Sequence, residues 1–343
     1  PAPEPTEPPA EEPAEEPAEE PAEEPAEEPA EEPAEEPAED ELVRPLVVSW
    51  PLTPPTINGD HAGGYSQAVA FNTCEQLLDY KRTTNQYGWD RALVEGLEAD
   101  EFEPRLAESW EQSEDGKTWT FHLRKGVLSN YGNELTAEDV KWSYDRAFIA
   151  EGIGGFIVHN GLRLDGIDSV KVIDDYTIQM TSIHPNPLFL NVLHICTPCI
   201  HDSTELKKHA TEEDPYAVDW TNTHNATFGP WQLEELEPGV QAVFTPNPNY
   251  YRGQPYFSEV IWREIPVSAN RMALLQGGDV DVALRLTGRE RAQLAGDDSL
   301  KIPRVQTNLT NQWRLNFNVE PFDNKLVRQA MAYSVPYDQI QEQ

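Results

Sequence analysis

The sequence predicts a mixed α/β fold with more than one domain, preceded by a segment that does not fold. Segments with an apolar residue at every second position, typical of strands, alternate with segments of helical periodicity. The chain has 343 residues, which is more than one hydrophobic core usually supports. Residues 1–41 are almost exclusively Pro, Ala and Glu, and the apolar part of the sequence starts at Leu42.

The first 41 residues are predicted to stay extended and hydrated. Between Glu11 and Ala38 the unit Glu-Glu-Pro-Ala repeats seven times. Proline at every fourth position removes a backbone donor and blocks a regular helix, and adjacent glutamates repel each other. In a polyproline-like form this repeat would reach about 85 Å. Such a segment suits a tether between an anchor and a working domain; an acidic low-complexity tail without a mechanical role is the alternative.

The charge balance of the rest of the chain argues against a nucleic-acid ligand. Of the 61 acidic residues 19 lie within residues 1–41, so 42 acidic and 25 basic side chains remain for residues 42–343. Binding to a phosphate backbone needs a stripe of Lys and Arg, whereas the densest basic cluster here is Arg124-Lys125. No apolar run approaches the roughly 20 residues that a membrane-spanning helix needs.

The folded part begins with a predicted strand and a predicted helix. Leu46–Trp50 is apolar, and Pro51 and the Pro54-Pro55 turn end this strand. Residues 66–80 have helical periodicity, so that one face of the helix would carry four apolar side chains. These are Phe71, Cys74, Leu77 and Leu78.

A strand with strict alternation and a capped helix follow. Between Lys117 and Arg124, apolar side chains alternate with Thr and His, which predicts a strand with one buried face. The buried side chains would be Trp119, Phe121 and Leu123. In Thr136-Ala-Glu-Asp139 a hydroxyl and an acid stand three residues apart, as in a capping box. The apolar face of the helix that it starts would be Val140, Tyr144, Ala147 and Phe148.

Two hairpins and four further elements complete the predicted fold. The hairpins run from Val170 to Met180 around Asp174-Asp175 and from Trp231 to Phe244 around Glu237-Pro-Gly239. The other elements are a strand over 260–265, a helix that is capped by Ser268, runs through Leu275 and is ended by Gly277-Gly278, an extended segment over 279–284, and a helix capped by Asp323. The apolar face of the last helix would be Leu326, Val327, Ala330 and Met331.

Seven blocks of sequence carry more information than their periodicity. They are Pro104–Glu111 (PRLAESWE), Glu114–Gly126 (EDGKTWTFHLRKG), Leu135–Ala147 (LTAEDVKWSYDRA), Phe228–Trp231 (FGPW), Asn247–Tyr251 (NPNYY), Leu275–Ala283 (LQGGDVDVA) and Pro321–Ala330 (PFDNKLVRQA). In this order they resemble the signature of the family 5 extracellular solute-binding proteins, which serve oligopeptide and dipeptide importers. The resemblance covers about residues 45–343. The blocks are turns, caps and strand cores, so they identify a fold and say little about the ligand.

The resemblance implies a periplasmic-binding-protein-like α/β fold of type II. In this fold two lobes, built of mixed sheets with flanking helices, close on a ligand by a hinge motion. Residues 42–78 and 184–312 would form the first lobe, and 79–183 a small inserted subdomain. Residues 313–343 would form the hinge strand and the start of a second lobe that is truncated in this chain.

The resemblance also implies which residues would contact a ligand. They are Gly63, Gly64, Tyr65, Ser66, Asn311, Gln312 and Trp313. The first four belong to a loop whose backbone would hydrogen-bond an extended peptide, and the alternative is an ordinary Gly-Gly turn before a helix. The last three lie on the crossing strand, where Trp313 would stack on a ligand or fill the hinge core.

The implied function is capture of di- or oligopeptides between the lobes and delivery to the permease subunits of an ABC importer. The implied receptor works outside the cytoplasm and reaches the membrane only through an N-terminal lipid anchor that is not in this chain. Neither catalytic residues nor a cofactor nor a metal is implied, and the sequence has no Gly-x-Ser-x-Gly, His-Glu-x-x-His or phosphate-binding Gly-Lys-Ser/Thr motif. The alternatives are an oligosaccharide carrier of the same family and, less favoured, a metal or haem carrier.

The segment His194-Ile-Cys-Thr-Pro-Cys-Ile-His201 gives the metal alternative its only support. It holds four soft ligands within eight residues, but so short a span rarely surrounds one ion tetrahedrally. A redox dithiol would need a helix that starts at the first cysteine, whereas Pro198 and the apolar neighbours favour an extended chain. A buried structural segment or a plain disulfide is the favoured interpretation, and whether Cys196 and Cys199 pair with each other stays open.

Overall fold

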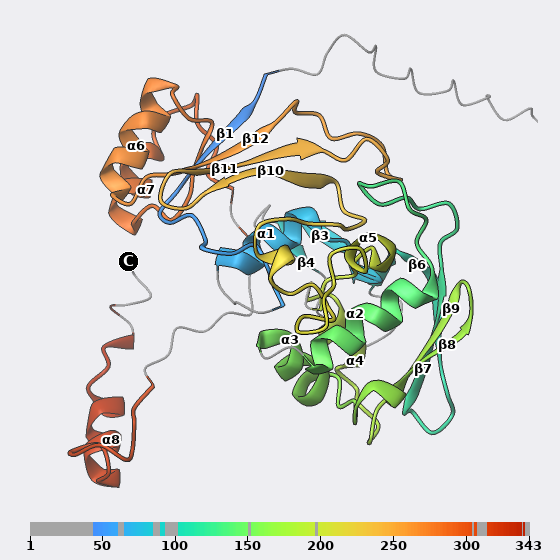
Figure 1. Ribbon diagram of the computed structural model, residues 1–343. Helices are drawn as coiled ribbons and strands as arrows, with labels where there is room; N and C mark the ends of the chain where they lie inside the picture. The colour runs from blue at the N-terminus through green and yellow to red at the C-terminus, as the bar shows by residue number, and fades with distance from the viewer. Residues whose placement is uncertain are drawn as a thin grey trace, which may run out of the picture. The chain divides into compact units, whose positions relative to one another are not determined.

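The computed structural model describes residues 44–60, 65–84, 90–92, 102–149, 152–195, 198–303, 305–306, 314–337 and 339. The chain divides into two compact units, Pro1–Glu41 and Leu42–Gln343. The first unit, which contains the predicted tether, lies outside the described residues. Figure 1 shows the second unit, a mixed α/β structure in which several sheets alternate with short helices, as the sequence predicts.

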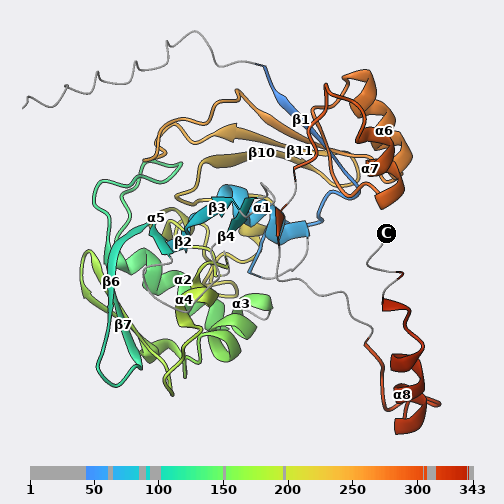
Figure 2. The ribbon, with the colours of Figure 1, turned by 180° about the vertical axis from the view of Figure 1, so that it is seen from behind.

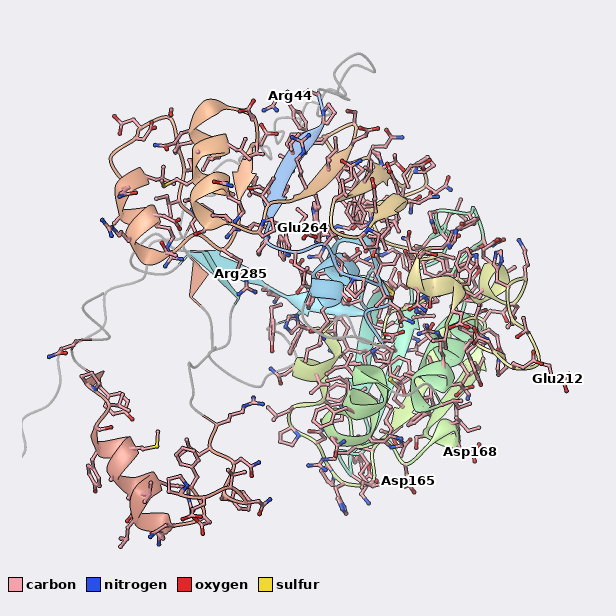
Figure 3. The ribbon with its side chains drawn as sticks, turned by 60° about the vertical axis from the view of Figure 1, so that its left-hand side comes forward. Arg44, Asp165, Asp168, Glu212, Glu264 and Arg285 are labelled. Carbon is pink, nitrogen blue, oxygen red and sulfur yellow. A yellow bond between two sulfur atoms is a disulfide. The ribbon has the colours of Figure 1, made fainter. Side chains whose placement is uncertain are left out.

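A five-stranded mixed sheet joins the beginning of the second unit to a segment two hundred residues further along. Its order is β10 (Trp231–Glu237), β11 (Gln241–Pro246), β12 (Val260–Glu264), β1 (Leu46–Trp50) and β13 (Val282–Ala283). β1 runs parallel to β12 and to β13, with Trp50 opposite Glu264 and Val48 opposite Val282. At the amino end of β1, the Asp281 carboxylate accepts a hydrogen bond from the Val47 amide and pairs with Arg44 at 2.6 Å. Figure 3 labels Arg44 at this end of β1.

The core of this sheet is built from the alternating apolar side chains of its strands. They pack on α1 (Tyr65–Thr73) and on the loop before it. The buried members are Val48, Ile57, Val69, Leu233, Ala242, Phe244, Val260 and Trp262. The helices α6 (Ser268–Gly277) and α7 (Gly288–Leu294) lie together beside β1 and β13 (Figure 1).

A four-stranded antiparallel sheet has the order β6 (Ala107–Gln112), β7 (Thr118–Leu123), β9 (Thr177–Thr181) and β8 (Val170–Asp174). In β7, Trp119, Phe121 and Leu123 are buried, as the alternation predicts. The helix α2 (Ala137–Ile149) packs against one face of this sheet, which Figures 1 and 2 show from opposite sides. The apolar core between them continues into residues 189–228, where Phe189 and Phe228 are fully buried.

The remaining elements are short and connect or flank the two sheets. β2 (Leu78–Tyr80) pairs with β5 (Phe102–Pro104), and β3 (Arg82–Thr84), β4 (Asp90–Ala92) and β14 (Val305–Gln306) form a third small sheet. The short helices are α3 (Ile153–Phe156), a π-helix (Ile157–Gly161), a 3-10 helix (Ile167–Ser169), α4 (Phe189–Leu193), α5 (Ser203–Leu206) and a 3-10 helix (Trp220–Asn222). The last helix is α8 (Lys325–Tyr333), which has no buried residue among its described positions.

The predicted helix over 66–80 is wrong in its second half. α1 ends at Thr73, and Leu77 and Leu78 are buried in and beside β2 instead. Phe71, which the sequence places on the inner face, is 45% exposed. A short apolar run fits a helix and a buried strand equally well, and the partner that decides, β5, is more than twenty residues away.

The predicted helix ends are mostly right, with shifts of one residue. The Thr136 amide donates to the Asp139 carboxylate as in a capping box, and α6 ends at Gly278 in a left-handed conformation. Ser268 opens α6 but does not cap it, because its hydroxyl donates to Glu290. Asn324 rather than Asp323 caps α8, since its side chain accepts from the Leu326 amide.

Candidate functional site

Three parallel strands end at the same edge of the five-stranded sheet. β12, β1 and β13 all run parallel, so their carboxyl ends meet there. In open α/β sheets, ligands bind in the crevice outside the carboxyl ends of the strands. The chain leaves β1 at this edge through residues 51–60, and α1 begins at Tyr65; Figure 1 shows both segments in blue. This edge, residues 51–60 and the start of α1 form the candidate site.

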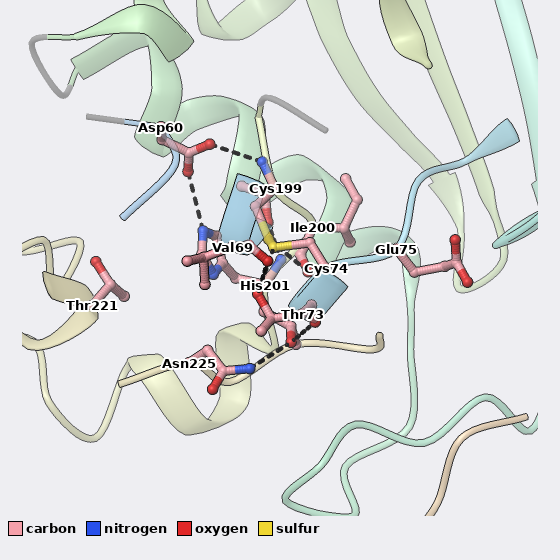
Figure 4. Close-up of a disulfide and its surroundings, with 12 residues drawn as sticks. Asp60, Val69, Thr73, Cys74, Glu75, Cys199, Ile200, His201, Thr221 and Asn225 are labelled. Carbon is pink, nitrogen blue, oxygen red and sulfur yellow. Dashed lines mark hydrogen bonds and ion pairs between the residues drawn. A yellow bond between two sulfur atoms is a disulfide. The ribbon is translucent and has the colours of Figure 1, made fainter. Parts of the chain in front are cut away.

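The connection is fixed at Asp60, which is 2% exposed. One oxygen of its carboxylate accepts hydrogen bonds from Nη1 of Arg146 at 2.5 Å and, through Nε2, from His201 at 3.1 Å. The other oxygen accepts from the backbone amide of Cys199 at 2.8 Å. Figure 4 shows the contacts of Asp60 with the Cys199 amide and with His201. Three distant segments of the chain therefore meet at one carboxylate.

The charges of this group are set by the competition between burial and hydrogen bonding. Burial raises the pKa of Asp60, but the hydrogen bond from His201 and the charge of Arg146 together bring that pKa below its ordinary value. Burial lowers the pKa of His201 and outweighs the hydrogen bond to Asp60. The group thus consists of an ionised Asp60, a charged Arg146 and a neutral His201.

The same connection is fixed at its other end by Ser66. The Ser66 side chain is 2% exposed, and its hydroxyl donates to the Thr56 carbonyl at 2.6 Å. Thr56 in turn donates its hydroxyl to the Asn222 side chain, and the Ile57 amide donates to the Asn222 carbonyl. The described residues on both sides of 61–64 are therefore held in place by hydrogen bonds.

The structure locates only part of the predicted ligand-binding set. Tyr65 opens α1, and Ser66 lies in its first turn with its hydroxyl turned inward to the loop. Gly63, Gly64, Asn311, Gln312 and Trp313 lie outside the described residues. The sequence offered His201 only as a possible metal ligand and did not predict that Asp60, Arg146 and His201 meet, because 86 positions separate Asp60 from Arg146 and no local pattern marks them as partners.

A disulfide joins the end of α1 to the same region. Cys74 is bonded to Cys199, across a sequence separation of 125 (Figure 4). This answers the open question of pairing: Cys199 pairs with Cys74, not with Cys196, which lies outside the described residues. Cys199 is therefore not available as a thiolate ligand, and His201 is bound to Asp60. Among the residues that the structure describes, no group of three or more His, Cys, Asp or Glu could hold a metal ion.

A glycine allows the chain to pass closely over the end of α1. A Cβ at Gly229 would lie 2.3 Å from the Thr73 carbonyl oxygen, which leaves no room for any side chain. Next to it, the Thr227 hydroxyl donates to the same carbonyl at 2.5 Å. The block Phe228–Trp231 is therefore conformational scaffold, as its composition predicts.

A polar pocket of about 410 Å³ lies beyond the carboxyl end of α1. In it the Tyr250 hydroxyl donates to Glu75 at 2.6 Å, and Arg105 pairs with Asp79 at 2.8 Å. Burial raises the pKa of Glu75. These four side chains form a polar network, while the buried Arg105 Nε and His194 Nδ1 in the same pocket have no hydrogen-bond partner among the described residues.

The neutral state of His201 makes stability depend on pH. In the unfolded chain an imidazole takes up a proton near its ordinary pKa of about 6.5. In the folded protein, burial and the charge of Arg146 hold the pKa of His201 below that value, although Asp60 and Asp202 act in the opposite direction. Its contribution to stability is therefore present above about pH 6.5 and is lost as the pH falls below that value. In His201→Gln, whose amide can still donate to Asp60, the loss of stability between pH 7.5 and 5.5 should be smaller than in the parent protein. Urea unfolding at both pH values measures this, and equal losses would contradict it.

Within the described part of the chain, no helix has the length and apolarity that crossing a membrane requires.

Residues 101–343 match the family model of bacterial extracellular solute-binding proteins, family 5 middle. The dipeptide-binding protein of Escherichia coli (strain K12) is 30% identical over 252 residues, which are 69% of this chain and 46% of that protein. Heme-binding protein A of Haemophilus influenzae is 28% identical over 250 residues, 68% of this chain and 45% of that protein.

The fold has solved counterparts as well. The crystal structure of a dipeptide-binding protein from Pseudoalteromonas sp. SM9913 with Met-Leu superposes with a TM-score of 0.71 at 19% identity, over 87% of this chain and 58% of that chain. The chain spans about half the length of the curated relatives that it matches. Since the family model covers well over half of its residues, the chain belongs to family 5 of the bacterial extracellular solute-binding proteins.

Proposed function

We propose that the protein is an extracytoplasmic receptor that captures di- or oligopeptides and passes them to the permease of an ABC importer. The observation that carries this proposal is the family match over residues 101–343, together with a dipeptide-binding relative at 30% identity. Proteins of family 5 are transport receptors rather than enzymes. The receptor would therefore work by affinity and closure, without chemistry on its ligand.

The candidate site suits a carrier that tolerates many side chains. A loop held at Asp60 and at Ser66 can offer its backbone to the main chain of an extended peptide. Main-chain hydrogen bonds are common to all peptides, so they give affinity without selecting a sequence. We propose that Gly63, Gly64, Tyr65 and the Ser66 backbone provide these contacts, and that Asn311, Gln312 and Trp313 face the ligand from the crossing strand.

The division into lobes is proposed on the pattern of the sheets. The five-stranded sheet takes its strands from 42–78 and 184–312, and the four-stranded sheet lies within 79–183. This supports a first lobe with an inserted subdomain, although residues 189–228 also contribute to the core of the inserted part. Residues 313–343 would start the second lobe. The greater length of the relatives supports a second lobe that is larger than these residues.

A haem carrier is the second candidate function, because heme-binding protein A is among the relatives. Calorimetric titration of the full-length protein separates the candidates. Three ligands would be titrated in separate experiments. They are an equimolar mixture of synthetic di- to pentapeptides, a mixture of cello-oligosaccharides, and haem. We expect saturable binding of peptides in the micromolar range and no response to the other two. Saturable binding of haem or of a sugar, with none of peptides, would overturn the peptide proposal.

We further propose that residues 1–41 act as a tether to a lipid anchor at the outer face of the membrane. The composition of the segment supports this proposal. Seven Glu-Glu-Pro-Ala units cannot form a hydrophobic core, and repulsion between their glutamate side chains keeps the chain extended. Deletion of residues 1–41 from the full-length protein should leave the melting temperature and the peptide affinity unchanged. A fall of several degrees would show that the segment packs on the folded part, which contradicts a tether.

A further inference from the structure

The pocket beyond the carboxyl end of α1 is separate from the candidate site. The candidate site includes the start of α1, whereas the pocket lies past its last residue, Thr73. α1 has nine residues, so its two ends are about 13 Å apart. The pocket volume of about 410 Å³ falls within the range of small-molecule sites. Cys74 lines the pocket, and its disulfide to Cys199 fixes this part of the wall.

The Glu75 carboxylate in this pocket has no counter-charge of its own. Glu75 is 5% exposed and forms no ion pair with any residue that the structure describes. One of its oxygens accepts from the Tyr250 hydroxyl at 2.6 Å, and the other accepts from the neighbouring Gln76 amide at 3.3 Å. Burial raises the pKa of Glu75 and outweighs the Tyr250 hydrogen bond and the charge of Arg105. Figure 4 shows the Glu75 side chain pointing away from the disulfide.

Another buried carboxylate without an ion pair is satisfied by its neighbours. Asp202 is 0% exposed and accepts from the Ser129 hydroxyl at 2.6 Å, the Asn133 side chain at 2.9 Å and the Glu205 amide at 2.9 Å. A carboxylate offers about four acceptor positions. Glu75, with one short hydrogen bond and one long one, therefore keeps acceptor capacity that Asp202 has used, and Glu75 lines a pocket.

The charges around the pocket favour a cation. Arg105 is already engaged, because its Nη2 pairs with Asp79 at 2.8 Å and with Glu103 at 2.6 Å. Burial lowers the pKa of Arg105, but the charges of Glu75, Asp79 and Glu103 outweigh it. Three carboxylates thus surround one guanidinium, so an anion would be repelled and a cation attracted. Arg105 Nε and His194 Nδ1 are buried and do not face a molecule in the pocket.

An exposed aromatic ring lies at the same pocket. Phe71 is 45% exposed, and the ring of His194 lies 6.5 Å from it. The face of an aromatic ring attracts an organic cation. A metal ion does not fit, since no group of three or more His, Cys, Asp or Glu in the described ranges could hold one. The combination of Phe71 and Glu75 instead suits an organic ammonium ion.

We propose that this pocket binds a small aliphatic molecule with a primary ammonium group, which donates to Glu75 and contacts the ring of Phe71. An ammonium has three donors, so it can use the free acceptor positions of Glu75 and supply the missing counter-charge. The amino end of a peptide has the same chemistry. We assign the pocket to a free amine, because the pocket and the candidate site lie at opposite ends of α1. The proposal is independent of peptide binding.

The test compares butylammonium with butanol, its neutral counterpart, by calorimetric titration of the full-length protein at pH 7. Glu75→Gln removes the charge but keeps an acceptor for the Tyr250 hydroxyl, and Phe71→Leu keeps an apolar side chain without the aromatic face. The control is Glu111→Gln, which removes the same charge from an exposed position on β6. This control separates the pocket from general attraction by a chain with a formal net charge of −36. Melting temperatures check that each variant is folded.

We expect butylammonium to bind saturably and about 10-fold or more tighter than butanol. Glu75→Gln should weaken butylammonium binding by about 10-fold and Phe71→Leu by about threefold, whereas Glu111→Gln should change it by less than about twofold. Equal binding of butylammonium and butanol, or equal binding by the parent and both pocket variants, would refute the amine site.

A second titration separates the two sources of an ammonium group. Butylammonium is titrated into the protein saturated with the best-bound peptide of the synthetic mixture, and we expect its affinity to be unchanged. Loss of butylammonium binding with this peptide, but not with its N-acetylated form, would assign the pocket to the amino end of the peptide and overturn a separate amine site. If the protein binds butylammonium and no peptide, the proposed peptide function fails and the amine site stands.

Discussion

Arg146→Met is expected to lower the free energy of unfolding by about 3–5 kcal/mol, because it removes one partner of a fully buried ion pair. Arg146 and Asp60 are 0% and 2% exposed at their side chains. Without the guanidinium, Asp60 would keep its hydrogen bonds from His201 and the Cys199 amide but would be a buried charge without a counter-charge. Arg146 also donates to the Thr221 hydroxyl at 2.8 Å, and this bond is lost as well.

The control for this prediction lies on the same helix. Lys141 pairs with Asp145 one turn away, near the surface of α2, and such pairs contribute well under 1 kcal/mol. Lys141→Met should therefore shift the urea midpoint much less than Arg146→Met. The double variant Asp60→Asn with Arg146→Met should lose less than the sum of the single changes, since it leaves no unpaired charge. If Arg146→Met lowers the free energy of unfolding by less than about 1 kcal/mol, the ion pair between Arg146 and Asp60 does not hold the segment that precedes α1.

Removal of the disulfide is expected to have an effect of similar size. The bond between Cys74 and Cys199 closes a loop of 125 residues, and the chain-entropy relation assigns to such a loop about 5 kcal/mol at most. Losses measured for native disulfides commonly fall at about 2–5 kcal/mol. Cys74→Ser with Cys199→Ser should therefore lower the melting temperature by about 10 °C. Differential scanning fluorimetry in the presence and absence of a reductant measures this.

The three cysteines provide their own controls. Reduction should lower the melting temperature of the parent protein but not that of the double variant. Cys196→Ser should leave the melting temperature and its response to reductant unchanged. The opposite pattern, in which Cys196→Ser destabilises and Cys74→Ser does not, would show that Cys199 pairs with Cys196 and that α1 is not tied to this region.

Both predictions concern the positioning of the candidate site. The ion pair fixes Asp60, immediately before residues 61–64, and the disulfide fixes the far end of α1. The backbone amide of Cys199 links the two, because it donates to Asp60. Loss of either contact should therefore weaken peptide binding as well as stability, through the loop rather than through direct contact with the ligand.

The fold class, the family and most of the local structure could be predicted from the amino-acid sequence. Alternation in Thr118–Leu123, the hairpin turn at Asp174-Asp175 and the glycine that ends α6 depend on neighbouring residues alone, so pattern and propensity suffice to predict them. The ordered blocks identified the family, since scaffold turns and strand cores keep their spacing when ligands change.

Contacts between residues far apart in the sequence could not be predicted, because they form only in the packed fold. The conversion of the end of the predicted helix into β2, the pairing of Cys199 with Cys74, and the convergence of Arg146 and His201 on Asp60 each join segments separated by more than twenty positions. Such contacts leave no periodic pattern in the sequence, because the residues next to a side chain in the sequence do not identify its partner on the other side of the core. The same limit holds for the buried Arg271 on α6, whose guanidinium donates to the carbonyls of Ile265 and Arg285 only after β12, α6 and β13 have packed together.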